Sequence, residues 1–160
     1  MVWCLLKPKF LQVKYHANGG NLLLTITIAT IPHASQRYPT VGDWQVRPAL
    51  DGLNLHITVS ELSDWRRELL VAIHELIEIG LLAHKHGPAA APTLQALVDN
   101  FDKGFEEDRA RGLHPIGAEP GDDAHAPYRD EHFLATTIER LLAQALGVDW
   151  PNYDAEVVSL

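Results

Sequence analysis

One stretch of the chain is apolar at almost every position. Residues 69–83 read LLVAIHELIEIGLLA, and their only charged or titratable side chains are His74, Glu75 and Glu78. In a helix, which turns about 100° per residue, the apolar side chains of this stretch point in every direction. The pattern therefore predicts a helix that is buried on all sides. Because Ser63 or Asp64 can cap its N-terminus, we expect this helix to begin close to residue 65.

The segments before this helix have the pattern of strands. Leu22–Thr30 is rich in β-branched residues, and Trp44–Arg47 is a candidate short strand. In Leu53–Val59 four apolar side chains alternate with three polar ones, which is typical of a half-buried strand. Asp51-Gly52 just before it is a hairpin signal. We expect these strands to form a small antiparallel sheet.

Two further helices are predicted after it, over about Pro92–Asp108 and about Asp130–Leu146. Each has a stripe of side chains at helical spacing that we expect to be buried: Leu94, Leu97, Val98, Phe101 and Phe105 in the former, and Leu134, Ile138, Leu141, Leu142 and Ala145 in the latter. Strands first and helices afterwards predict the α+β class, with a small antiparallel sheet from the N-terminal third packed on about three helices. The length of 160 residues fits a single domain, 1–160, in which 1–20 and 150–160 are peripheral.

Composition excludes several classes of function. The net charge is −8 and the basic residues are scattered, so a nucleic-acid partner is not expected. The single cysteine, Cys4, excludes an internal disulfide and a cysteine-based zinc cluster. No apolar run reaches the ~18 residues that span a bilayer, and the N-terminal MVWCLLKPKF does not read as a signal peptide. We expect a soluble cytoplasmic protein without a membrane partner.

The acidic residues of the apolar helix indicate a cation. Ionised carboxylates are rarely buried unless they are paired or bind a metal ion. His74 and Glu78 are four residues apart and share one face of the helix, where both can be ligands. Glu75 is rotated by about 100° from His74 and could reach a bound water as general base. Imidazole and carboxylate suit zinc best, and manganese or iron are tolerated.

The strand LNLHITVS followed by the helix VAIHELIE resembles the active-site region of zincin metallopeptidases over about Leu53–Leu82. Those enzymes carry His-Glu-x-x-His after an edge strand that binds extended peptide. The resemblance implies that His74 is the first metal ligand, that Glu75 is the catalytic base, and that Leu53–Val59 aligns the substrate. This chain departs from the motif at Glu78, which adds negative charge and makes a bound water less acidic. More loosely, the chain resembles small uncharacterised phage-encoded proteins, which implies no chemistry.

A third ligand is expected from the segment Asp122–His132, which holds four acidic residues and two histidines. In zincins of the glutamate type this ligand comes from a later helix. We favour His132, because Glu78 already supplies carboxylate charge. Glu131 is the alternative third ligand, and His125 comes after it.

Three other interpretations remain open. His74, Glu75 and Glu78 can form a buried hydrogen-bonded cluster that pairs with Arg66, Arg67 or Arg140. A magnesium-dependent nucleotide pyrophosphohydrolase would use Glu75, Glu78, Asp99 and Asp102, which resemble the paired acidic motifs of all-α enzymes of that type. In a non-enzymatic binding protein the cation would only stabilise the fold. The hypothesis we favour is a metal-dependent, zinc-containing hydrolase that acts on a peptide or a small molecule.

Overall fold

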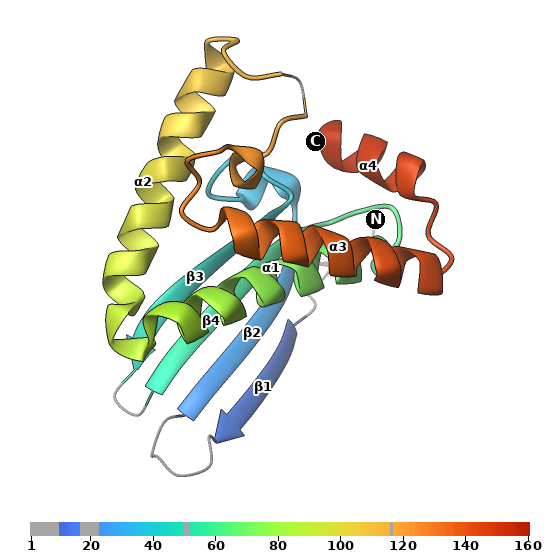
Figure 1. Cartoon of the computed structure of the whole chain (residues 1–160). Helices are drawn as coiled ribbons and strands as arrows, with labels where there is room; N and C mark the ends of the chain where they lie inside the picture. Colours follow the sequence, from blue (N-terminus) through green and yellow to red (C-terminus); the bar gives the residue numbers. More distant parts are fainter. Residues whose placement is uncertain (1–9, 17–22, 50–51, 116) are drawn as a thin grey trace, which may run out of the picture.

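The computed structural model describes residues 10–16, 23–49, 52–115 and 117–160, and in this part of the chain four strands form one mixed sheet (Figure 1). The strands are β1 (Phe10–His16), β2 (Leu23–Ile31), β3 (Gly42–Ala49) and β4 (Gly52–Ser60), in the order β1-β2-β4-β3. β1 pairs with β2 and β3 with β4 in antiparallel fashion, whereas β2 and β4 are parallel. The expected antiparallel pairing therefore holds for two of the three pairs. The chain places β3 at the edge and returns as β4 between β2 and β3, which makes the third pair parallel.

In the described part of the chain four helices follow the sheet, which confirms the α+β class but adds one helix to the three expected. They are α1 (Trp65–His86), α2 (Ala91–Ala110), α3 (Arg129–Ala145) and α4 (Trp150–Val158). Short 3₁₀ turns lie at His33–Ser35, Pro88–Ala90 and Pro120–Asp122. Asp64 caps α1, because its Oδ1 accepts a hydrogen bond of 2.9 Å from the Arg66 backbone N–H. Among the described residues, no helix combines the length and the hydrophobicity that crossing a membrane requires.

The core lies between the sheet and α1. Leu53, Leu55, Ile57 and Val59 point from one face of β4 and are buried, and Trp44 of β3 lies on the same face. α1 packs on this face with Leu70, Ile79 and Leu82, among other residues. α3 packs on α1 from the other side (Figure 1). α1 is thus the middle layer, and its polar side chains are held between the sheet and α3.

The burial of α1 is less complete than its sequence predicts. Trp65 and Leu69 are exposed, and Ile73 and Ile77 are only half-buried. These side chains follow one another at intervals of four residues, so they form one stripe that faces neither the sheet nor α3. The prediction of a helix buried on all sides is wrong for this stripe.

The apolar stripes of the later helices are also buried only in part. In α2, Leu94, Val98 and Phe105 are buried as expected, but Leu97 is exposed. In α3, Leu134 and Leu141 are exposed, whereas the buried face carries Glu131, His132, Ala135, Glu139 and Ala143. The two alanines leave room for close packing on α1, and the polar side chains find partners there.

The strand Leu53–Val59 does not lie at an edge. β4 pairs with β2 on one side and with β3 on the other, so its backbone groups are used within the sheet. The expectation that this strand aligns a substrate is therefore wrong. The edge nearest to α1 is β3.

Both segments expected at the periphery contain regular structure. Of residues 1–20, the structure describes 10–16, which form the edge strand β1. Residues 150–160 contain α4, and Tyr153 of this helix is buried. α4 is joined to the start of α1, since Glu156 accepts hydrogen bonds from Ser63 and forms an ion pair with Arg67.

Candidate metal centre

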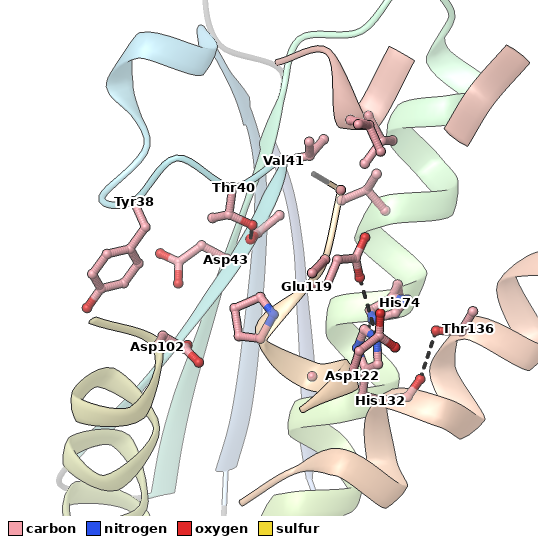
Figure 2. A pocket seen from close by; sticks show the side chains of 18 of the residues that line it. Tyr38, Thr40, Val41, Asp43, His74, Asp102, Glu119, Asp122, His132 and Thr136 are labelled. Carbon is pink, nitrogen blue, oxygen red and sulfur yellow. Dashed lines mark hydrogen bonds and ion pairs between the residues drawn. The ribbon is translucent and has the colours of Figure 1, made fainter. Parts of the chain in front are cut away.

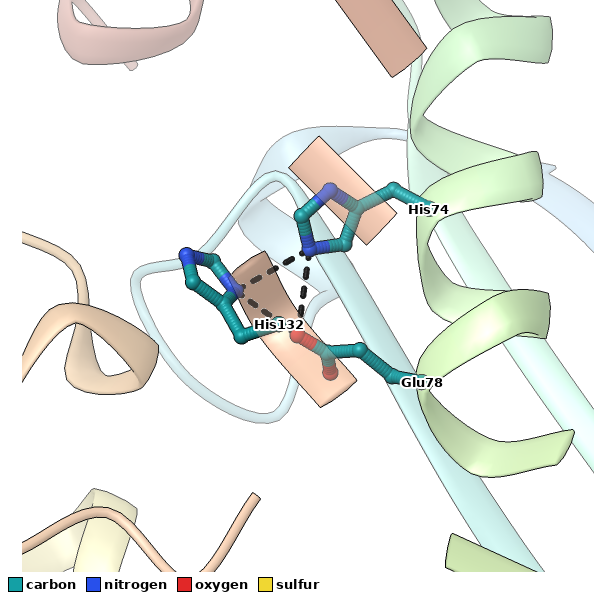
Figure 3. A group of neighbouring side chains, drawn as sticks. All are labelled: His74, Glu78 and His132. Atoms are coloured by element: carbon teal, nitrogen blue, oxygen red, sulfur yellow. Dashed lines mark hydrogen bonds and ion pairs between the residues drawn. The ribbon is translucent and has the colours of Figure 1, made fainter. Parts of the chain in front are cut away.

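Three side chains from α1 and α3 converge at one point (Figure 3). Nε2 of His74 lies 3.1 Å from Oε1 of Glu78 and 3.1 Å from Nδ1 of His132. Nδ1 of His132 lies 2.7 Å from the same Glu78 oxygen. All three residues are buried, and in the described part of the chain no other group of three such donors lies this close together.

Hydrogen bonds from both imidazoles can satisfy the Glu78 oxygen, but they leave one unfavourable contact, between the two ring nitrogens. Each ring nitrogen carries at most one hydrogen, and the carboxylate oxygen carries none when it is ionised. Two imidazole nitrogens at 3.1 Å can share only one hydrogen between them or repel each other. In a tetrahedral zinc site with bonds of about 2.0–2.1 Å, neighbouring ligand atoms are about 3.3 Å apart. A cation would therefore fit if the 3.1 Å distances grew by about 0.2 Å and the distance from Glu78 to His132 by about 0.6 Å.

Glu139 and Tyr153 orient His74 through the ring nitrogen that does not face the cluster. The Nδ1–H of His74 donates to Oε2 of Glu139 over 2.9 Å, and the Tyr153 hydroxyl donates to the other oxygen of that carboxylate. Burial on its own lowers the pKa of His74, but the hydrogen bonds to Glu139 and Glu78 outweigh it and raise the pKa to about 11. Without a metal, His74 is therefore protonated on both nitrogens. A bound cation would replace the proton on Nε2, while Glu139 keeps the proton on Nδ1 and so fixes the orientation of the ring.

Trp44 holds Glu78 in a similar way. Its indole Nε1–H donates to Oε2 of Glu78 over 3.2 Å, which leaves Oε1 for the two histidines. Burial favours the neutral acid, but the hydrogen bonds from His132 and His74 are stronger and lower the pKa of Glu78 to about 2. The carboxylate is therefore ionised and presents a single oxygen to the cluster.

His132 is fixed by the loop before α3 (Figure 2). Its Nε2 lies 3.4 Å from a Glu119 oxygen and 3.6 Å from an Asp122 oxygen. Gly121 packs closely against the ring, because a Cβ added there would be only 2.3 Å from Cγ of His132. All three members of the cluster thus have outer partners, as is common for metal ligands.

Glu75 lies next to the cluster and has a different environment. Among the described residues it makes no hydrogen bond or ion pair, and it lines a cavity together with His74 and Glu78. A Cβ added at Gly42 would be 2.2 Å from its Oε1, so only glycine at that position leaves room for this carboxylate. Burial and the charge of Glu78 raise the pKa of Glu75 well above its usual value.

The cavity beside the cluster has a volume of about 540 Å³. Its walls come from the loop before β3, from α1 and α2, from the loop before α3, and from α3 and α4 (Figure 2). Asp102 of α2 lies in this wall and accepts a hydrogen bond of 2.7 Å from the Tyr128 hydroxyl. Burial raises the pKa of Asp102 to about 7, and nearby carboxylates add to the effect.

The structure brings together His74, Glu78 and His132, and it places the alternative ligands elsewhere. Glu131 is buried but forms an ion pair of 3.0 Å with Lys85. His125 is exposed and contacts Asp123.

The residues of the magnesium hypothesis do not gather around one point. Asp99 accepts hydrogen bonds from Arg37 and Gln95, and Asp102 accepts one from Tyr128. The arginines of the hydrogen-bonded interpretation are engaged elsewhere as well. Arg66 binds Asp64, Arg67 binds Glu156, and Arg140 lies over the Trp150 ring.

Sequence reasoning missed most of the outer partners. Glu139 had a usable signal, since it lies seven residues after His132 and so shares a helix face with it. Trp44, Gly121 and Tyr153 had none, because their contacts join distant segments.

The comparisons with known proteins give no match. No family model fits the chain, and neither the curated proteins nor the solved structures include one with significant similarity to it.

Proposed function

We propose that the protein is a metal-dependent hydrolase in which His74, Glu78 and His132 bind a zinc ion. The observation that carries this proposal is the convergence of three buried donor atoms within 3.1 Å of one another, each donor side chain contacting an outer partner. Two imidazoles and one carboxylate are a donor set used by catalytic zinc sites. Iron and manganese also accept this set, so the metal identity is part of the test.

Three protein ligands leave one coordination position of a tetrahedral ion free. A cavity next to that position supports a catalytic role for the ion and argues against a purely structural one. A zinc ion there would supply a Lewis acid that polarises a carbonyl group and makes water more acidic. Glu75 lines the cavity without a hydrogen-bond partner in the described part of the chain. The charge of a bound cation would favour its ionised form, which can accept a proton from water. The resemblance to the zincin helix supports the same role for Glu75.

The surroundings give less support to a nucleotide substrate. The cavity walls carry ten carboxylate side chains against the two guanidinium groups of Arg109 and Arg140. Arg109 already binds Glu106 and the Ala118 carbonyl, and Arg140 is stacked on Trp150. A triphosphate would meet strong repulsion there unless several cations accompanied it.

The test is elemental analysis of protein purified without an affinity tag, combined with hydrolysis assays on small amides and esters. We expect wild-type protein to contain close to one equivalent of zinc. His74→Ala removes a ligand and should lose the metal. Glu75→Gln should keep the metal but lower hydrolysis by about 10²- to 10⁴-fold, which is the usual contribution of a general base.

His84→Ala is the matched control, because His84 is an exposed histidine in the last turn of α1. It should retain both the metal and the activity. Equal metal content in wild type and His74→Ala would contradict the proposed ligand set. A metal-containing wild type whose hydrolysis does not depend on Glu75 would contradict the proposed role of the base.

A further inference from the structure

The outer edge of β3 is the only strand edge next to the candidate centre in the described part of the chain. The other edge of the sheet, β1, is separated from β3 by β2 and β4. Across the β3–β4 pair, the Val41 carbonyl accepts a hydrogen bond from the Ser60 N–H. Since the bonding direction alternates along an antiparallel strand, the backbone groups of Gly42, Trp44, Val46 and Pro48 point outward. An extended peptide that added to this sheet would have to bind these groups.

Side chains of the protein already occupy this edge. The Thr40 hydroxyl donates to the Gly42 carbonyl over 2.9 Å, and Arg37 Nη2 donates to the Trp44 carbonyl over 3.3 Å. The Val46 N–H donates to Oε1 of Gln95 over 2.7 Å. Pro48 has no N–H to offer.

The groups that cap the edge are themselves fixed. Arg37 makes two bonds to Asp43, of 2.7 and 2.8 Å, and one of 3.3 Å to Asp99. Asp99 also accepts a hydrogen bond of 2.8 Å from Nε2 of Gln95, so the loop before β3 and helix α2 share one hydrogen-bond network. α2 lies along this edge of the sheet (Figure 1). β3 is therefore covered in the way that proteins protect an edge strand from pairing.

The cavity that reaches the cluster has the size of a small-molecule site. Its volume is about 540 Å³. A volume of this size is typical of sites that enclose a small ligand.

We propose that the centre acts on compact amides or esters enclosed in this cavity, and not on extended polypeptides aligned along β3. The inference rests on the proposed hydrolase function and names its substrate class. The side chains that cover the edge oppose strand addition, and the volume of the cavity is in the range of sites that bind a small molecule.

One test compares two ligands with the same metal-binding group on the zinc-containing protein. N-acetylalanine hydroxamate represents the compact class, and the hydroxamate of acetylated hexaalanine represents the extended class. We expect calorimetry to show binding of the short ligand and an affinity for the long ligand that is lower by at least about tenfold, or 1.4 kcal/mol. An affinity for the long ligand equal to or above that of the short one would overturn the inference.

A second test examines the covered edge without any metal. Amide hydrogen exchange at Val46 should be slow in the wild type and clearly faster in Gln95→Ala, which removes the acceptor. Asn100→Ala, another amide residue of α2 but an exposed one, is the control and should leave exchange at Val46 slow. Rapid exchange at Val46 in the wild type would mean that the edge is open, which contradicts the inference.

The two proposals fail in distinguishable ways. Zinc-containing protein that binds neither hydroxamate would contradict an enclosed compact ligand but leave the metal site intact. Protein that holds no metal would contradict the proposed function, and the substrate class would fall with it.

Discussion

Gly121 is a single residue on which the position of a whole imidazole depends. Its α-carbon faces the ring of His132, and a Cβ there would lie 2.3 Å from Cγ and 2.5 Å from Nδ1. Nδ1 is the atom that faces His74 and Glu78. A methyl group at this position would therefore force the ring, or the loop that carries Gly121, to move.

We expect Gly121→Ala to lower zinc affinity by about tenfold or more, which is the scale of losses seen when the support of a ligand is disturbed. Competition with a chromophoric chelator measures this directly. Gly104→Ala in α2 is the control, because a Cβ there meets nothing within 4 Å. The control should keep its zinc affinity and gain up to about 1 kcal/mol in stability, since alanine is the better helix former. Unchanged zinc affinity in Gly121→Ala would contradict the tight contact.

Asp102 makes stability depend on pH. Burial raises its pKa from the usual 3.8 to about 7 in the folded protein. Between about pH 4 and pH 7 the folded state therefore binds more protons than the unfolded state, so the free energy of unfolding falls as the pH rises through this range. Above pH 7 the ionised, buried carboxylate is a net cost.

Asp102→Asn should remove this part of the pH dependence. At pH 8, in the presence of a chelator, we expect the variant to melt a few degrees above the wild type, and at pH 4 to melt at nearly the same temperature or below it. The asparagine can still accept a hydrogen bond from Tyr128. Asp130→Asn, at an exposed position of α3, is the control. Parallel melting curves of Asp102→Asn and wild type from pH 4 to 8 would exclude a raised pKa.

Residue-level prediction from the sequence worked best where it depended on local geometry. The i, i+4 spacing of His74 and Glu78 fixed their common face, and the structure places them 3.1 Å apart. His132, favoured over Glu131 on grounds of charge, is the residue that joins them. Contacts such as that of Trp44 with Glu78 join positions 34 residues apart, and no periodicity indicates them.

Among the helices, α3 illustrates why an amphipathic pattern can mislead. Its leucines suggested the buried face, yet Leu134 and Leu141 are exposed and the polar His132 and Glu139 are buried. Polar side chains can be buried when partners satisfy them, and these two have partners on α1. The helix was predicted correctly, but the face that it buries was not, because a buried polar cluster reverses the usual preference.

The strands show a similar limit. Local alternation correctly marked Leu53–Val59 as a strand with one buried face. Its place between β2 and β3 depends on the parallel pairing with β2, which spans about thirty residues of sequence. No local pattern carries that information.

α4 is coupled to the centre through one hydroxyl group. Tyr153 donates to Glu139, which in turn accepts a hydrogen bond from His74. We expect Tyr153→Phe to weaken metal binding by about tenfold and to change the visible spectrum of the cobalt-substituted protein, because the orientation and basicity of His74 change.

Ser63→Ala is the control for this prediction. It removes a hydrogen bond of 3.0 Å to Glu156 and so loosens the attachment of α4 without touching the Glu139 contact. If both variants lost metal equally, the role of Tyr153 would be that of a general anchor for the helix. An unaltered cobalt spectrum in Tyr153→Phe would also indicate that Tyr153 only anchors the helix and does not affect His74.

For the molecule as a whole, the proposed ion joins separate layers. Its ligands come from α1 and α3, and the partner of Glu78 comes from β3 of the sheet. Without a cation, two histidines with raised pKa values and two carboxylates share a buried space. The metal is therefore expected to contribute to the stability of the entire fold.

Removal of zinc with a chelator should lower the melting temperature by about 10 °C, since an ion at about a thousand times its dissociation constant contributes about 4 kcal/mol. Calorimetry with and without chelator, followed by addition of zinc, measures the effect and its reversal. His74→Ala should show no response to the chelator. A zinc-containing wild type with the same melting temperature in both conditions would contradict a stabilising ion.

The hydrogen bond from Trp44 to Glu78 connects the sheet to the candidate metal centre. The indole ring belongs to the sheet, yet its N–H is attached to the carboxylate that faces both imidazoles. A metal ion bound to that carboxylate changes the charge next to the indole ring. The fluorescence emission of Trp44 should therefore report metal binding without an added label. Once the other tryptophans are replaced by phenylalanine, the fluorescence of Trp44 can be followed while each candidate ion is added to the protein.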